Sequence, residues 1–112
     1  MLLSTLNTYS DPLRRAADRL NTACNLGELE GGLLASRSLW QGIERHLARA
    51  EARADGHTVR AIFGICPETL RRQAEFVNRV TAADPAVSDE SVEALITINR
   101  QAAEMLTLAR VE

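Results

Sequence analysis

Hydrophobic residues between positions 29 and 54 repeat at the spacing of one helical face. Positions 29, 33, 36, 40, 43, 47, 50 and 54 are separated by steps of four and three, which makes a seam of the kind found in helix pairs and bundles. The seam consists of Leu29, Leu33, Ser36, Trp40, Ile43, Leu47, Ala50 and Ala54. Gly31 and Gly32 weaken the start of this predicted helix by about 1 kcal/mol each relative to alanine. Gly56 is predicted to end it.

An earlier helix is predicted to begin at Asp11 and Pro12. Asp11 is a suitable N-cap, and proline suits the first helical position. Apolar residues then recur at helical spacing, and Gly27 is a plausible stop. These apolar residues are Leu13, Ala16, Ala17, Leu20 and Cys24. The same stripe extends backwards and indicates a short preceding helix that breaks at Pro12, through Leu2, Leu3, Leu6 and Tyr9.

Pro67 divides the third apolar region into two parts. Before it, Val59, Ile62 and Phe63 are spaced to face inward from a short helix, although "VRAIFGI" is also compatible with a strand. From Pro67 a firmer helix is predicted to about Thr81, because proline suits a helix start and the next apolar residues share one face. That face carries Leu70, Ala74 and Val77.

The last helix is predicted from Ser88 to about Ala109. Ser88 is a good N-cap, and Asp89 and Glu90 suit the positive end of the helix dipole. At about 100° per residue, an apolar arc covers more than half of the circumference. The arc holds Val92, Leu95, Ile96, Ile98, Ala102, Met105, Leu106 and Leu108. Such a helix is either central in the fold or covered by a partner.

The pair Asn99 and Arg100, in "ITINRQ", is divided by the phase of this helix. Asn99 falls inside the apolar arc and is expected to be a core amide hydrogen-bonded to a neighbouring helix, with contact to a partner as the alternative. Arg100 falls on the polar strip and is expected to face water beside Glu104, four residues on. Trp40 lies on the seam of the second helix and is expected in the core, where its indole N–H needs an acceptor.

These elements predict an all-α fold, a small bundle of four principal helices whose third region is broken near Pro67. The 112 residues suit a single helical domain over residues 1–112, with enough apolar surface for one modest core. Apolar residues make up 46% of the chain and charged residues 25%, which argues against disorder.

Charge and apolar runs exclude several functional classes. The net charge is −2, so nucleic-acid binding is not expected. All basic residues are arginine, which suits contacts with carboxylates but does not establish a site. No apolar run approaches the roughly 18 residues of a membrane helix. The first residues lack the features of a signal peptide. Cys24 and Cys66 form no evident disulfide framework. A cytoplasmic protein without a membrane partner is therefore expected.

Catalytic, metal and cofactor sites are not predicted. His46 and His57 lie eleven residues apart and have no other ligand at a familiar spacing. Cys66 precedes Pro67 at a possible helix start, which can activate a thiol, but a small buried hydrophobe is the simpler interpretation. The glycines fit no phosphate-binding loop. We therefore expect a protein that is not an enzyme and binds no cofactor.

Three blocks of the sequence resemble the FlaF family of flagellar biosynthesis regulators. They are "LLASRSLWQGIERHL", "EFVNRVT" and "SVEALITINRQAAEML". The matching positions are Arg37 and Trp40, then Phe76, Val77, Asn78 and Arg79, then Leu95, Ile96, Ile98, Asn99 and Arg100. The chain departs from the family pattern between residues 50 and 72, where the spacing is longer and Pro67 interrupts the helix.

The resemblance implies a short helical, cytoplasmic protein that promotes flagellin production and export, acting as a chaperone-like partner of flagellin. It implies a partner-binding set of Arg37, Trp40, Phe76, Asn78, Arg79, Leu95, Ile98, Asn99 and Arg100. An apolar groove for a flagellin helix is the physically natural mode of binding. Two alternatives remain. One is a homodimer that buries the apolar arc, and the other is a translational regulator that acts on flagellin mRNA.

Overall fold

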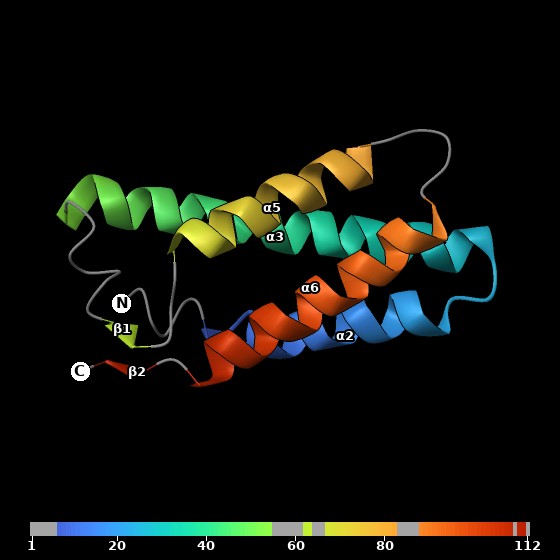
Figure 1. Ribbon diagram of the computed structural model, residues 1–112, viewed down its shortest axis with the longest axis horizontal. Coiled ribbons are helices and arrows are strands. Elements are labelled where there is room, and N and C mark those ends of the chain that lie inside the picture. The colour runs from blue at the N-terminus through green and yellow to red at the C-terminus, as the bar shows by residue number, and fades with distance from the viewer. Residues whose placement is uncertain (1–6, 55–61, 64–66, 83–87, 109, 112) are drawn as a thin grey trace.

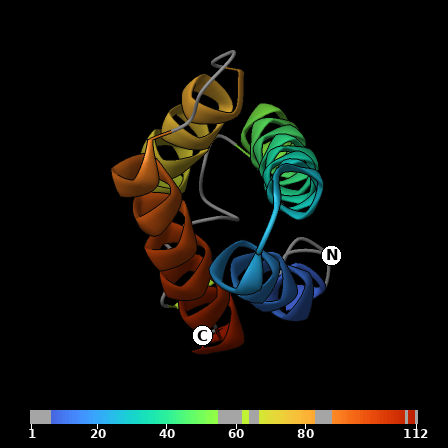
Figure 2. The same ribbon diagram turned by 90° about the vertical axis from the view of Figure 1, so that its right-hand side faces the viewer.

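The computed structural model describes residues 7–54, 62–63, 67–82, 88–108 and 110–111. These residues form four long helices, which are α2 (Ser10–Thr22), α3 (Leu26–Ala54), α5 (Pro67–Ala82) and α6 (Asp89–Leu108). Figure 1 shows each helix running antiparallel to the one before it. Viewed from the end, the helices surround a common centre in the order α2, α3, α5 and α6 (Figure 2). The predicted all-α bundle is confirmed.

Two very short strands lie outside the bundle. β1 (Ile62–Phe63) pairs antiparallel with β2 (Arg110–Val111), with Ile62 opposite Val111. The short helix expected around Ile62 and Phe63 is therefore wrong for these two residues, and the strand alternative is right. They pair with a segment that only folding brings close, which local spacing cannot reveal. Val59 lies outside the described residues, as do Leu2, Leu3, Leu6 and Gly56.

The start of α2 differs from the prediction. The helix begins at Ser10, its N-cap position is Tyr9, and no side chain caps it. Asp11 lies inside the first turn, where its carboxylate accepts a hydrogen bond from Arg14 at 3.2 Å. Buried Ser10 instead donates its hydroxyl to the carbonyl of Ala103 on α6 at 3.0 Å. Asp11 is thus not the cap, because the helix already contains it.

The turn between α2 and α3 is fixed by a cap that the sequence prediction missed. Asn25 Oδ1 accepts from the backbone N–H of Glu28 at 2.9 Å, and the Glu28 carboxylate accepts from the backbone N–H of Cys24 at 3.0 Å. This reciprocal arrangement resembles a capping box. Gly27 lies within α3, so it does not end the preceding helix. The sequence contains the signal for this cap, because Asn25 and Glu28 have the spacing Asn-x-x-Glu.

The other two helices begin and end close to the predicted positions. Ser88 caps α6 by accepting a hydrogen bond from the backbone N–H of Ser91 at 3.2 Å. α6 ends at Leu108 and α5 runs from Pro67 to Ala82. The favourable first-turn charges also match, since Asp89 and Glu90 both lie in the first turn of α6.

The apolar arc of α6 is covered by the chain's own helices. Leu95, Ile96, Ala102 and Leu106 are buried, and Val92, Ile98 and Met105 pack against the same core while remaining partly exposed. Only Leu108, at the end of the helix, keeps a large exposed fraction, 56%. The arc is wide because α6 packs against both α2 and α5 and also faces the common core. Most of the arc is therefore covered within the chain itself.

Candidate functional site

Asn99 is fully buried at the point where α6 faces α3. Its Oδ1 accepts a hydrogen bond from the Trp40 indole Nε1 at 2.8 Å, and its Nδ2 donates to the Ser36 hydroxyl at 2.9 Å. The prediction of a core amide bonded to a neighbouring helix is confirmed, and so is the burial of Trp40. Because each buried polar group has a partner, burying the cluster costs little free energy, and the hydrogen bonds fix the position of α6 relative to α3 across the core.

Arg100 lies on the exposed side of α6. Its Nη2 approaches Asp18 Oδ1 on α2 at 3.5 Å, and both side chains are more than half exposed. The predicted pairing of Arg100 with Glu104 is not the one observed, because α2 packs beside α6 and brings a carboxylate from another helix within reach. An exposed ion pair of this length contributes little to stability.

The second Asn-Arg pair, Asn78 and Arg79, is divided in the same way. Asn78 is half-buried and donates its Nδ2 to Glu44 on α3, while its buried Oδ1 has no hydrogen-bond partner within the described residues. Arg79 is exposed, and its guanidinium lies over the ring of Phe76 at 5.7 Å from the centroid. Asn78 therefore faces the neighbouring helix and Arg79 faces water.

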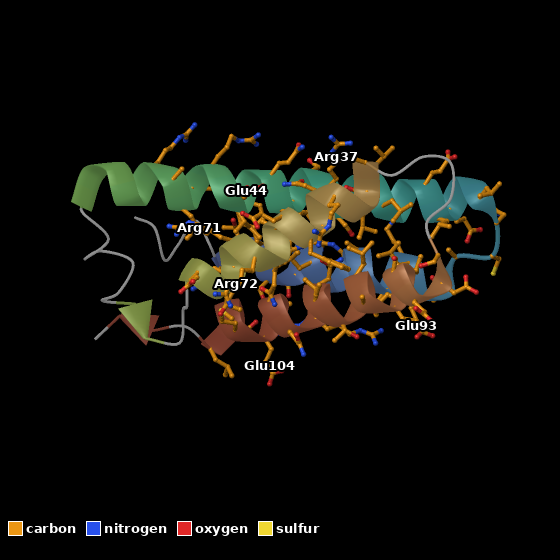
Figure 3. The ribbon with its side chains drawn as sticks, turned by 45° about the horizontal axis from the view of Figure 1, so that its top comes forward. Arg37, Glu44, Arg71, Arg72, Glu93 and Glu104 are labelled. Atoms are coloured by element: carbon orange, nitrogen blue, oxygen red, sulfur yellow. The ribbon has the colours of Figure 1, made fainter. Side chains whose placement is uncertain are left out.

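The nine residues that the family resemblance selects do not form one surface. Trp40, Leu95 and Asn99 are fully buried, so none of them reaches a partner in this conformation. Arg37 projects from the side of α3 (Figure 3), and Ile98 packs partly against the core. The fold brings Trp40 and Asn99 together. The accessible members of the set are scattered over three helices.

A groove on the outer side of α2 and α3 was not foreseen from the sequence. Its volume is about 470 Å³. It is lined by Pro12, Arg15, Ala16 and Arg19 from α2 and by Ala35, Ser38 and Leu39 from α3. Two spacings of four residues, Arg15 to Arg19 and Ala35 to Leu39, were the available signals. Neither indicates a groove until the two helices are placed side by side.

The shape of the groove follows from contacts at its two ends. Leu20 packs so close to Gly32 that an added Cβ there would lie 2.8 Å from Leu20 Cδ2. At the other end, the Tyr9 ring occupies the space that a side chain at Gly42 would need. Between these two contacts the groove is lined by Ala16 of α2 and by Ala35 and Ser38 of α3, beside larger residues of both helices. The two close contacts therefore lie on either side of the lining residues.

The rim of the groove is positive. Arg15 and Arg19 are exposed, and within the described part of the chain neither forms a hydrogen bond or ion pair. The two acidic side chains of α2 are already engaged, since Asp11 pairs with Arg14 and Asp18 pairs with Arg100. Two guanidinium groups therefore border an apolar floor without a compensating carboxylate from α2.

Among the described residues, no group of three or more His, Cys, Asp or Glu side chains is placed to hold a metal ion. His46 contacts the Tyr9 ring edge-on, with centroids 5.8 Å apart. Cys24 is exposed, while Cys66 and His57 lie outside the described residues. Within the described residues, the α2/α3 groove offers a concave surface with apolar and basic lining.

No described helix has both the length and the apolar character needed to cross a membrane. Comparisons with protein-family models, with curated proteins and with solved structures found no match to this chain. The resemblance to the FlaF family rests on the three sequence blocks.

Proposed function

We propose that the protein is a non-enzymatic, cytoplasmic binding protein that holds a helical segment of flagellin and so promotes flagellin production and export. The observation that carries the binding role is the α2/α3 groove, with an apolar floor and two unpaired arginines at its rim. Helix-in-groove recognition uses such a surface, because the apolar face of an amphipathic helix fills the hollow and the rim selects by charge. Flagellin as the partner comes from the FlaF resemblance.

This proposal moves the binding surface away from the family-matched positions. Trp40, Leu95 and Asn99 hold the bundle together, so we assign them a structural role. A groove that is already formed before binding lowers the entropy cost of association, because only the partner segment has to become ordered. A chaperone-like protein has to release its partner again, so we expect binding in the groove to be reversible.

The two alternatives have weaker support. A homodimer was motivated by the apolar arc of α6, which the chain itself largely covers. Binding to flagellin mRNA requires a broad positive surface, and the net charge of −2 opposes it. A gel shift with the flagellin leader RNA that weakens as salt is raised would support that second alternative.

Co-purification of the folded protein with purified cognate flagellin tests the proposal. We expect a complex at micromolar concentration, detected as co-elution on size exclusion, with circular dichroism confirming that the protein is helical. Absence of a complex at that concentration, with both proteins folded, contradicts the proposed function.

A further inference from the structure

We infer that the α2/α3 groove takes an acidic amphipathic helix, whose aliphatic side chains enter the hollow while carboxylates one turn apart pair with Arg15 and Arg19. The inference deepens the proposed function by naming the chemistry of the bound segment. It concerns the groove alone and is testable with or without flagellin.

The floor of the groove sets the size of what enters. Ala16 and Ala35 face the hollow with single methyl groups, and Pro12 and Leu39 supply its apolar sides. A volume of about 470 Å³ holds branched aliphatic side chains from more than one position. The lining residues run from Pro12 to Arg19 on α2 and from Ala35 to Leu39 on α3, so the hollow spans about 10 Å along α2 and about 6 Å along α3, or one to two helical turns.

The rim sets the charge of the bound segment. Arg15 and Arg19 lie four residues apart on α2, so their attachment points are about 6 Å apart along the helix axis. Carboxylates at positions i and i+4 of a partner helix have the same separation. Arginine suits the task because its planar guanidinium donates two parallel hydrogen bonds to one carboxylate. On the opposite side, exposed Ser38 is neutral and leaves the positive rim uncompensated.

Two matched variants isolate the rim charge. The test variant is Arg15→Glu with Arg19→Glu. The control is Arg45→Glu with Arg49→Glu, which makes the same charge change at the same spacing on exposed positions of α3 that do not line the groove. Ser38→Glu is a second test variant, because it places one carboxylate beside the two arginines with a single exposed substitution. Circular dichroism and urea denaturation establish that each variant is folded.

The probe is a fluorescein-labelled synthetic helical peptide that carries leucines on one face and glutamates at i and i+4 beside them. A second peptide has glutamine in place of both glutamates. Fluorescence anisotropy is measured at low and high salt. We expect Arg15→Glu with Arg19→Glu to weaken binding of the glutamate peptide by about tenfold or more, because two attractive pairs become repulsive. The control variant is expected to bind like the wild type.

Three results overturn the inference. They are equal binding of the glutamate and glutamine peptides, equal weakening by the control variant, and binding that salt does not change. Self-association that the Arg15→Glu and Arg19→Glu changes abolish, with no peptide binding, also overturns it, because the occupant is then a second copy.

The same variants with flagellin separate this inference from the proposed function. If flagellin binds the wild type and the Arg15→Glu, Arg19→Glu variant equally, the groove is not its site and the inference fails while the proposed function stands. If the glutamate peptide binds at the rim but flagellin does not bind, the inference stands and flagellin is the wrong partner.

Discussion

Asn99 and Arg100 are neighbours in the sequence but lie in opposite environments. One helical step turns a side chain by about 100°, enough to place Asn99 in the core against Trp40 and Ser36 and Arg100 in water beside Asp18. Asn78 and Arg79 are divided similarly on α5. In both pairs the asparagine contacts a neighbouring helix. The recurring Asn-Arg pattern therefore reflects helix packing.

Replacing Asn99 with leucine is expected to destabilise the fold by about 1–3 kcal/mol, because the buried Trp40 N–H loses its acceptor. Trp40→Phe alone also destabilises, since it leaves Asn99 Oδ1 unpaired and removes volume from the core. The double variant should lose about 1 kcal/mol less stability than the sum of the two single losses. It contains neither the Trp40 N–H nor the Asn99 Oδ1 that each single change leaves unpaired. Urea denaturation of the four proteins measures this coupling. Strict additivity would show that the hydrogen bond contributes nothing.

Arg100→Ala is expected to change the free energy of unfolding by less than about 0.5 kcal/mol, because its ion pair with Asp18 is long and exposed. Asp18→Ala serves as the matched control from the opposite partner. The measurement is thermal or urea denaturation at low salt, where surface pairs count most. A loss above 1 kcal/mol for Arg100→Ala would show that Arg100 has a structural role that this ion pair does not explain.

The phase of the last helix was enough to predict that Asn99 lies in the core and that Arg100 faces water. Helical periodicity placed Asn99 and Trp40 in the core, and the need to satisfy buried polar atoms required a partner for each. It did not show that they are partners of one another, because 59 residues separate them in the sequence. The pairing of Arg100 with Asp18 was missed for the same reason: local spacing offers Glu104, and only tertiary packing offers α2.

At the scale of the helices, Gly31 and Gly32 show what local propensity leaves out. Both weaken an isolated helix, which was the whole of the sequence interpretation. In the bundle they differ. A Cβ at Gly31 would meet only the flexible end of exposed Arg19, at 2.7 Å, whereas a Cβ at Gly32 would meet buried Leu20 at 2.8 Å. Gly32 is thus needed where α2 and α3 approach closely.

These two adjacent glycines give a matched comparison. Gly31→Ala is expected to stabilise the protein by about 0.5–1 kcal/mol, because alanine has the better helix propensity and Arg19 can move aside. Gly32→Ala is expected to destabilise it by about 1 kcal/mol, because crowding against Leu20 outweighs the same propensity gain. Urea denaturation compares the two. Equal stabilisation by both would mean that Leu20 has room and that no close approach exists there.

Helix positions were predicted well and helix ends less well. The spacing of apolar residues located the four helices, because burial of one face dominates the choice of structure. The cap made by Asn25 and Glu28 was missed because Gly27 offered a competing stop signal. The strand pair joins Ile62 with Val111, 49 residues later, and Phe63 with Arg110, so no local pattern specifies it.

For the molecule as a whole, the candidate partner surface is the α2/α3 groove and not the apolar arc of α6 that the sequence suggested. The arc suggested a partner surface from the sequence, but most of it packs against the core of the bundle. The groove is not evident from either helix alone, because its lining comes from both α2 and α3. The lining residues lie between two close contacts of these segments. A surface of this kind cannot be predicted from the sequence until two elements are placed side by side.

Backbone amide NMR spectra of the labelled protein, recorded as unlabelled flagellin is added, would locate the binding surface. Binding in the groove should shift the amide signals of Arg15, Arg19, Ser38 and Leu39 first, with little change at the exposed residues of α5. Shifts confined to α5 and α6, or spectra unchanged at micromolar flagellin, would contradict binding at the α2/α3 groove.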